Sequence, residues 1–141
     1  AGGISEVTWS LAQRFWPGSL TLVVRRSHIV PDLVTGGRDT VAVRVPAHPV
    51  PRELARGLGR PITGTSANLS GQPPAATAQE LHSWLGAHVD MVMEGGASPG
   101  QTESTILDVS GASPLLIRRG AVAEDAIREY LAEMDKDLAV A

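Results

Sequence analysis

The stretch Leu20-Thr21-Leu22-Val23-Val24-Arg25 (LTLVVR) decides the fold class of this chain. It is apolar at almost every position, which predicts a β-strand buried on both faces. A second segment of this kind, Thr40 to Val45 (TVAVRV), follows the turn signal Gly36-Gly37. Ahead of the first strand, a helix is predicted, with Ser5 as a possible cap and Pro17-Gly18 as its end. Its apolar positions at near-helical spacing are Ile4, Val7, Leu11 and Phe15.

The rest of the chain continues the alternation of helices and strands. The expected elements are a helix from Pro49 to Leu58, a short strand from Pro61 to Thr63, a helix that Thr77 and Glu80 cap and that runs to Leu85, a strand from Val89 to Met93, a turn from Gly95 to Gly100, a hairpin of Ser104 to Val109 with Pro114 to Arg118, a helix from Glu124 to Met134, and a short frayed tail. Because the pattern alternates but includes a hairpin, we expect an α/β protein with a mixed sheet. No linker long enough to divide the chain is visible, so residues 1–141 are expected to form one domain.

Composition narrows the classes of function. The 141 residues are 43% hydrophobic and 19% charged, as in ordinary globular domains. A net charge of −3 argues against a strongly basic nucleic-acid module, although it is compatible with a local basic patch. There is no cysteine, which excludes disulfides and thiolate metal sites, and no secretory signal or membrane-spanning run is visible. We expect a cytoplasmic protein without a membrane segment.

Several common motifs of catalysis are missing from the sequence. There is no Gly-rich loop followed by Lys and Ser/Thr, and no Gly-x-Gly-x-x-Gly after a strand. The four histidines lack metal-ligand spacing, and His82 and His88 are expected to be solvated. No pair of carboxylates stands out as an acid/base couple.

The polar loop from Thr63 to Gly71 is the most informative candidate site. It follows the predicted strand Pro61 to Thr63, and ligands of open α/β sheets bind beyond the carboxyl ends of strands. Its short hydroxyl and amide side chains could bind phosphate or ribose without blocking the backbone N–H groups. The alternative is an ordinary polar turn with local capping bonds.

A second polar cluster, Gln101 to Thr105, also lies beside a predicted strand, and two arginines lie near strand ends. Arg44 and Arg118 must each reach solvent or an anionic partner, because a buried unpaired charge is unfavourable. A guanidinium group suits a carboxylate or phosphate ligand, but it suits a structural ion pair equally well.

Five motifs in chain order resemble those of the YrdC-type threonylcarbamoyl-AMP synthase family. They are Phe15 to Thr21 (FWPGSLT), Val41 to Pro49 (VAVRVPAHP), Pro61 to Gly71 (PITGTSANLSG), Ser104 to Asp108 (STILD) and Leu116 to Ala121 (LIRRGA). Ser19 and Arg119 stand where the family commonly has proline. The resemblance implies a YrdC-like twisted mixed β-sheet flanked by helices.

The resemblance also implies an activity, that of an L-threonylcarbamoyladenylate synthase. Such an enzyme makes threonylcarbamoyl-AMP and pyrophosphate from L-threonine, bicarbonate or CO2, and ATP. A downstream tRNA threonylcarbamoyl-transferase complex then uses the product to form N6-threonylcarbamoyladenosine (t6A) at position 37 of tRNA. Mg2+ is expected to accompany ATP, with no ligands assigned in this chain.

Site residues follow by matching the family motifs to this sequence. The resemblance implies that Ser66 and Asn68 form the catalytic Ser-x-Asn pair and that Thr65 lines the ATP pocket with them. It implies that Arg44 and Ser104 hold the carboxylate of L-threonine. It implies that Arg118 contacts ATP.

Two motifs of the family have no counterpart here, the Thr-x-x-Val-Tyr-Gly segment and the Lys-x-Arg pair. The single lysine of the chain, Lys136, is near its C-terminus. We therefore expect residues 1–141 to be an N-terminally truncated YrdC-like domain, its C-terminal two-thirds, with weak or no activity alone.

Two other functions stay open. The first is a non-catalytic nucleotide- or RNA-binding module, for which the net charge and the few aromatic residues give no support. The second is the YrdC-like part of a larger carbamoyltransferase, such as a hydrogenase maturation factor.

Overall fold

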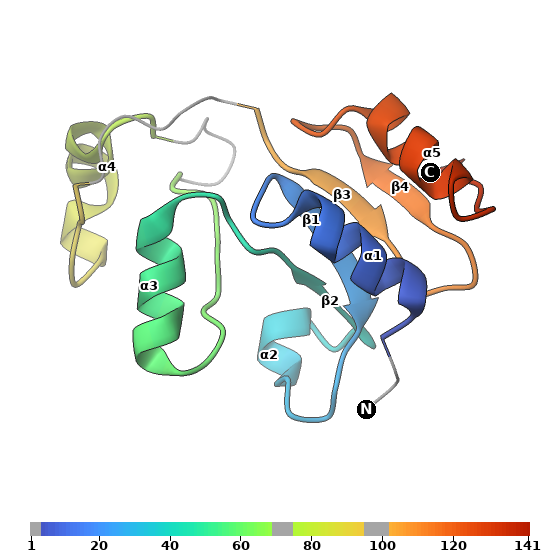
Figure 1. The fold of residues 1–141 in the computed structure, drawn as a ribbon. Helices are drawn as coiled ribbons and strands as arrows, with labels where there is room; N and C mark the ends of the chain where they lie inside the picture. The colour runs from blue at the N-terminus through green and yellow to red at the C-terminus, as the bar shows by residue number, and fades with distance from the viewer. Residues whose placement is uncertain (1–3, 69–74, 95–101) are drawn as a thin grey trace. The chain divides into compact units, whose positions relative to one another are not determined.

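The computed structural model describes residues 4–68, 75–94 and 102–141. By its internal contacts the chain separates into two compact units (Figure 1). Residues 1–52 and 102–141 form the first, which we call the sheet unit, and residues 53–101 form the second, the inserted unit.

A five-stranded mixed sheet forms the centre of the sheet unit, with the strand order β2-β1-β3-β4-β5. The strands are β1 (Leu20–Arg25), β2 (Thr40–Val43), β3 (Thr105–Asp108), β4 (Leu115–Arg118) and β5 (Ala139–Val140). β1 is antiparallel to β2 and parallel to β3, β3 is antiparallel to β4, and β4 is parallel to β5. This arrangement confirms the predicted α/β class and the predicted hairpin. The frayed tail was a wrong prediction, because backbone hydrogen bonds from Ala139 to Pro114 and from Ala141 to Leu116 hold it against β4.

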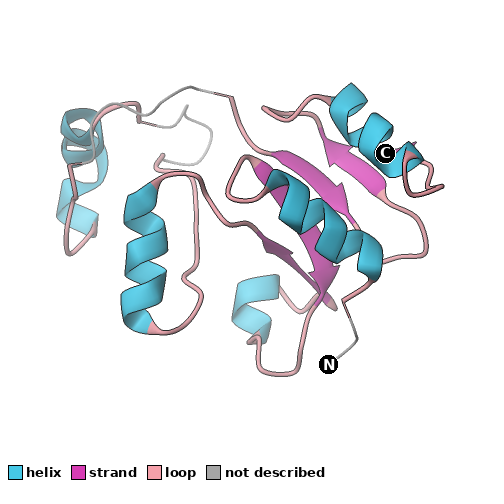
Figure 2. Ribbon diagram, viewed as in Figure 1, coloured by secondary structure: helices cyan, strands magenta, loops and turns pink. Residues whose placement is uncertain are grey.

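Two helices pack on one face of this sheet, α1 (Glu6–Phe15) and α5 (Glu124–Ala132), both cyan in Figure 2. The ring of Tyr130 packs edge-on against Phe15 with 5.9 Å between centroids, and its hydroxyl lies 2.6 Å from Ser10 Oγ. The side chains buried in this core are Leu11, Ala12, Leu20, Leu22, Leu107, Val109, Leu116, Ile127, Leu131 and Leu138.

Strand β1 is buried on one face only. Leu20 and Leu22 are fully buried beneath the helices, whereas Thr21 and Val23, which point to the other face, are half-buried. The prediction of burial on both faces was therefore wrong. The reason is that α1 and α5 cover the same face of the sheet.

Local capping signals set the ends of the helices in the sheet unit. Ser5 Oγ accepts a hydrogen bond from Thr8 N at 3.2 Å and caps α1 as predicted. Between β1 and β2, directly before the predicted turn at Gly36-Gly37, lies a short helix, α2 (Asp32–Thr35), which was not predicted. It ends at Gly36 with a φ of 61°, a left-handed conformation that glycine adopts without strain.

The inserted unit contains α4 (Ala78–Leu85), the 3₁₀ turn η1 (Gly86–His88) and most of α3 (Pro49–Leu58), which spans the boundary. Thr77 Oγ1 accepts from Glu80 N at 3.2 Å, as the capping box predicts. The reciprocal bond differs, since Glu80 Oε2 accepts from Ala76 N at 2.8 Å.

Two predicted strands of the inserted unit are wrong. Residues 61–63 and 89–93 have no regular secondary structure, and most of their side chains are exposed. Both apolar runs are short, and no described strand pairs with either of them. The turn expected from Gly95 to Gly100 lies outside the described residues.

Candidate functional site

The topology of the sheet brings one end of four strands together. Leu20 at the start of β1 pairs with Thr105 at the start of β3. Because β2 and β4 run antiparallel to these strands, their last residues lie at the same end. Arg44 directly follows β2 and Arg118 ends β4, so both predicted arginines lie at this end of the sheet unit.

Ser104 lies at the centre of a hydrogen-bonded network at this end. Thr21 Oγ1 donates to Ser104 Oγ at 2.8 Å. Arg118 donates to the carbonyl oxygen of Ser104 from Nε at 3.1 Å and from Nη2 at 2.8 Å, and Nη2 also lies 3.3 Å from Ser104 Oγ. The structure thus brings together two predicted site residues and adds Thr21.

An irregularity in β4 directs Arg118 to the open face of the sheet. The register shifts between Ile106 and Leu107, so that Leu107 pairs with Leu116 but Ile106 pairs with Arg118. In a regular strand Leu116 and Arg118 would point to the same face. The extra residue, Ile117, reverses this, and Arg118 reaches Ser104 instead of the core that contains Leu116.

Glu103 completes the surroundings of Arg118. Its Oε2 lies 2.8 Å from Arg118 Nη1, and the two side chains are 64% and 38% exposed. Its backbone oxygen accepts from Ala121 N at 2.9 Å. Neither Glu103 nor Thr21 is among the predicted site residues, although Glu103 lies in the polar cluster before β3 and Thr21 ends the FWPGSLT motif. Only the pairing of the strands shows that both are near Arg118.

Neighbouring residues of the same motifs have structural roles. Thr105 is fully buried, and its hydroxyl donates to Val122 O at 2.7 Å and accepts from Val122 N at 3.0 Å. Arg119 pairs with Glu124 at 2.9 Å. The hydrogen bond from Arg128 is the largest cause that lowers the pKa of the Glu124 carboxyl below its ordinary value; desolvation opposes it, and the hydrogen bond from Arg119 lowers the pKa further.

Arg44 is exposed at the same sheet end, and within the described residues it has no ion pair. The next residue is tied to the segment after α1, because Gly18 N donates to Val45 O at 2.8 Å. Because Arg44 is exposed and has no ion pair within the described residues, its guanidinium group is available to an anion. The hydrogen bond of Val45 anchors the backbone beside Arg44.

The predicted nucleotide loop belongs to the inserted unit. Thr65 and Ser66 are exposed and Asn68 is half-buried. Asn68 N donates to Ser66 O at 3.1 Å, Ala75 N donates to Ala67 O at 2.9 Å, and the backbone bends at Ala67 and Asn68. Thr65 and Ser66, which carry the hydroxyls of the predicted site, are both exposed.

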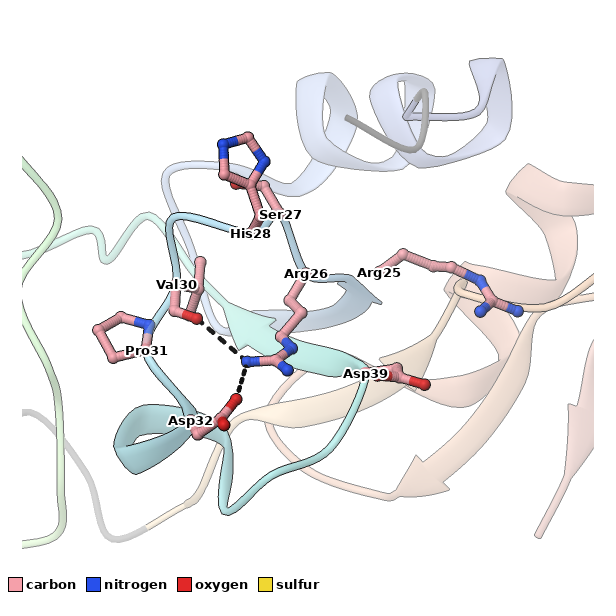
Figure 3. A pocket seen from close by; sticks show the side chains of 8 residues that line it. All are labelled: Arg25, Arg26, Ser27, His28, Val30, Pro31, Asp32 and Asp39. Carbon is pink, nitrogen blue, oxygen red and sulfur yellow. Dashed lines mark hydrogen bonds and ion pairs between the residues drawn. The ribbon is translucent and has the colours of Figure 1, made fainter.

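An open surface pocket lies at the other end of β1, and the charged residues and histidine that line it are Arg25, Arg26, His28, Asp32 and Asp39 (Figure 3). Arg26 pairs with Asp32 and donates to Val30 O at 3.1 Å. The pocket contains no residue of the predicted site. The residues that line the pocket carry charges of both signs, and Asp32 already neutralises Arg26.

The described residues contain no group of three His, Cys, Asp or Glu side chains that could hold a metal ion. His82 and His88 are exposed, as predicted. Among the described residues, no helix has the length and apolar character needed to cross a membrane.

Comparisons with known proteins agree on one family. The profile of the Sua5/YciO/YrdC family, described as "Telomere recombination", matches residues 2–120. The threonylcarbamoyl-AMP synthase of Pyrococcus abyssi is 39% identical over 131 residues, which are 93% of this chain and 38% of that protein. The Bacillus subtilis enzyme of the same name is 34% identical over 137 residues, 96% of this chain and 40% of its own.

Solved structures give the same result. P. abyssi Sua5 in complex with L-threonine superposes with a TM-score of 0.89 at 38% identity, covering 98% of this chain and 40% of that one. Escherichia coli YciO superposes with a TM-score of 0.77 at 29% identity, covering 85% of this chain and 59% of that one. The chain thus spans less than two thirds of the length of these relatives, and it belongs to the Sua5/YciO/YrdC family.

Proposed function

We propose that this chain supplies the L-threonine- and ATP-binding residues of an L-threonylcarbamoyladenylate synthase. The observation that carries the proposal is the network of Thr21, Ser104 and Arg118, because it presents a hydroxyl and a guanidinium group together at one end of the sheet. Relatives of the chain are named threonylcarbamoyl-AMP synthases, and P. abyssi Sua5, which superposes on the chain, was solved with L-threonine.

The proposed reaction has two steps. The neutral amine of L-threonine attacks the carbon of CO2 and releases a proton to form a carbamate; from bicarbonate the same product forms with release of water. An oxygen of the carbamate then attacks the α-phosphorus of ATP, and the bond to pyrophosphate breaks. Both steps bring anions together, so the protein has to position them and balance their charge. The product would serve a transferase complex that forms t6A at position 37 of tRNA.

Each predicted residue has a role in this proposal. Arg44 binds the carboxylate of L-threonine, and Ser104 donates its hydroxyl proton to the same group while it accepts from Thr21. Arg118, which Ser104 holds through its carbonyl oxygen, contacts the phosphates of ATP. Thr65, Ser66 and Asn68, which belong to the inserted unit, bind the nucleotide, and Ser66 and Asn68 are the catalytic pair that the family motif implies.

Mg2+ would reach the site on the phosphates of ATP. In ATP-dependent enzymes Mg2+ is usually bound through one or two carboxylates together with the phosphates of the nucleotide. When bound, it would neutralise phosphate charge. The residues of this chain would only orient the phosphates that carry it.

We expect these 141 residues alone to bind ligands but to show little synthase activity. The Lys-x-Arg pair of the family has no counterpart in this sequence, and Lys136 does not match it. Formation of threonylcarbamoyl-AMP by this chain at a rate comparable to that of its relatives would contradict this expectation.

Binding is therefore the sharpest test. Isothermal titration calorimetry with L-threonine and with ATP, separately and together, should show both ligands binding. Loss of a hydrogen bond to a charged group changes affinity by about 1.5–3 kcal/mol, or roughly 10- to 100-fold. Arg44→Ala should weaken L-threonine binding by this factor, and Ser66→Ala should weaken ATP binding.

Two exposed residues provide matched controls for these substitutions. Arg38 lies near the start of β2, away from the candidate site, and Ser113 lies in the turn of the β3–β4 hairpin. Arg38→Ala and Ser113→Ala should leave both affinities unchanged. If Arg44→Ala and Ser66→Ala are equally silent, the proposed assignment is wrong. Binding of RNA with a strong salt dependence, without binding of ATP, would favour an RNA-binding module instead.

A further inference from the structure

Every nitrogen of the Arg118 guanidinium group already has a partner within the chain. Nε and Nη2 donate to the carbonyl oxygen of Ser104, and Nη1 pairs with Glu103 Oε2 at 2.8 Å. The partner of Nε and Nη2 is a backbone atom next to the sheet. The partner of Nη1 is a side-chain carboxylate in an ion pair at the surface.

The two sides of Arg118 differ in how easily they can be released. Ser104 O is a backbone atom, and Ser104 is the residue directly before β3. The Glu103 side chain is 64% exposed, and Arg118 is its only partner within the described residues. An ion pair at this exposure contributes about 0.2–1 kcal/mol, so a stronger anion can displace the carboxylate.

The backbone of Glu103 cannot follow its side chain. Ala121 N donates to Glu103 O, and a Cβ atom on Gly120 would lie 2.4 Å from that same oxygen. This close backbone approach fixes the position of the Glu103 Cα atom beside Arg118. When the Glu103 carboxylate leaves Arg118, the side chain rotates about its own bonds, and the carboxylate stays near the ligand.

We propose that Glu103 is an electrostatic latch on Arg118, which the phosphates of ATP must displace in order to bind. The inference rests on the proposed function, because it takes ATP as the ligand of Arg118. The latch keeps the guanidinium neutralised and oriented without ligand. It also selects against weakly charged ligands, because only a group that outcompetes a carboxylate reaches Nη1.

A different role for Glu103 would change the affinity for ATP in the opposite direction when the carboxylate is removed. If Glu103 stayed on Arg118 and oriented it in the complex, removal of the carboxylate would weaken ATP binding. If Glu103 is a latch, removal frees Nη1 and eliminates repulsion between the carboxylate and the phosphates, so that ATP binds more tightly.

The test measures the affinity of the full 141-residue chain for ATP and for L-threonine by calorimetry in Glu103→Gln and Glu103→Ala. We expect ATP to bind about three- to tenfold more tightly to both variants, from the strength of an exposed ion pair plus the lost repulsion. Affinity for L-threonine should stay within about twofold. Glu129→Gln on α5 changes the net charge by the same amount at an exposed position and should leave both affinities unchanged.

The outcomes separate the latch from the proposed function. Unchanged or weaker ATP binding in both Glu103 variants overturns the latch, and the proposed function stands if the wild-type chain still binds ATP and L-threonine. Tighter binding of L-threonine alone also overturns it, because Arg118 would then serve the amino acid. If neither the wild-type chain nor the Glu103 variants bind ATP, both proposals are wrong.

Discussion

The two units of the chain support their predicted site residues in different ways. Ser104 and Arg118 lie on a sheet whose opposite face is a closed apolar core, with Leu107 and Leu116 almost fully inaccessible to solvent. In the inserted unit, by contrast, none of the described residues is buried, and Thr65 and Ser66 are exposed.

This difference shows what fixes each group of side chains. The positions of Thr21, Ser104 and Arg118 follow from the register of three strands, which cannot shift by one residue without exposing the core. In the inserted unit, Ser66 and Asn68 are linked by a local backbone bond of 3.1 Å between residues two positions apart. We therefore expect substitutions of equal size to have unequal effects in the two units.

The largest contrast should come from truncating one leucine in each unit. Leu107 on β3 is fully buried, so Leu107→Ala should lower the free energy of unfolding by about 2–5 kcal/mol through lost contacts and a residual cavity. Leu54 on α3 is 46% exposed, and Leu54→Ala should lower it by less than about 1 kcal/mol. Urea unfolding followed by circular dichroism measures both. Equal losses would show that the inserted unit has a core of its own.

A second contrast uses two glycines. A Cβ atom at Gly120 would lie 2.4 Å from Glu103 O and 2.5 Å from Thr105 N, and these backbone atoms cannot move aside. Gly120→Ala should therefore destabilise the sheet unit by about 1–3 kcal/mol. Gly57 in α3 has no atom within 4 Å of such a Cβ, so Gly57→Ala should stabilise the helix by up to about 1 kcal/mol. Opposite shifts in melting temperature are expected, and a drop for Gly57→Ala would contradict the open surroundings described here.

The smallest contrast concerns acid stability. The pKa of Glu124 is lowered by Arg128 and Arg119, so its charge stabilises the folded state above its ordinary pKa of 4.5, and this contribution is lost as the pH falls further. Glu124→Gln should therefore make stability less dependent on pH below about 5, as measured by melting temperature between pH 3 and 7. Glu53, whose pair with Arg56 in the inserted unit is largely exposed, is the matched control. Glu53→Gln should leave the pH profile unchanged.

Elements with strong local signals were predictable from the sequence. β1 and α3 have the predicted bounds, and Ser5 and Thr77 are the predicted caps. These signals depend on residues within a few positions of one another. The predicted strands at residues 61–63 and 89–93 failed because a short apolar run becomes a strand only when another strand pairs with it.

The candidate site was predictable only in part, for the same reason. The motif resemblance pointed to Ser104 and Arg118, but their hydrogen bonds depend on a register shift that no local pattern reveals. Thr21 and Ser104 are 83 residues apart in the sequence. The roles of Thr21 and Glu103 can therefore be recognised only once the pairing of the strands is known.

The same separation has a consequence for the order of folding. β1 and β2 can pair soon after synthesis, but β3, the other neighbour of β1, follows only after the whole inserted unit. Until then one edge of β1 has unpaired N–H and C=O groups, a feature that promotes aggregation. We expect a nascent chain that stalls within the inserted unit to be less soluble than one that has passed Asp108, because only the longer chain can close the middle of the sheet.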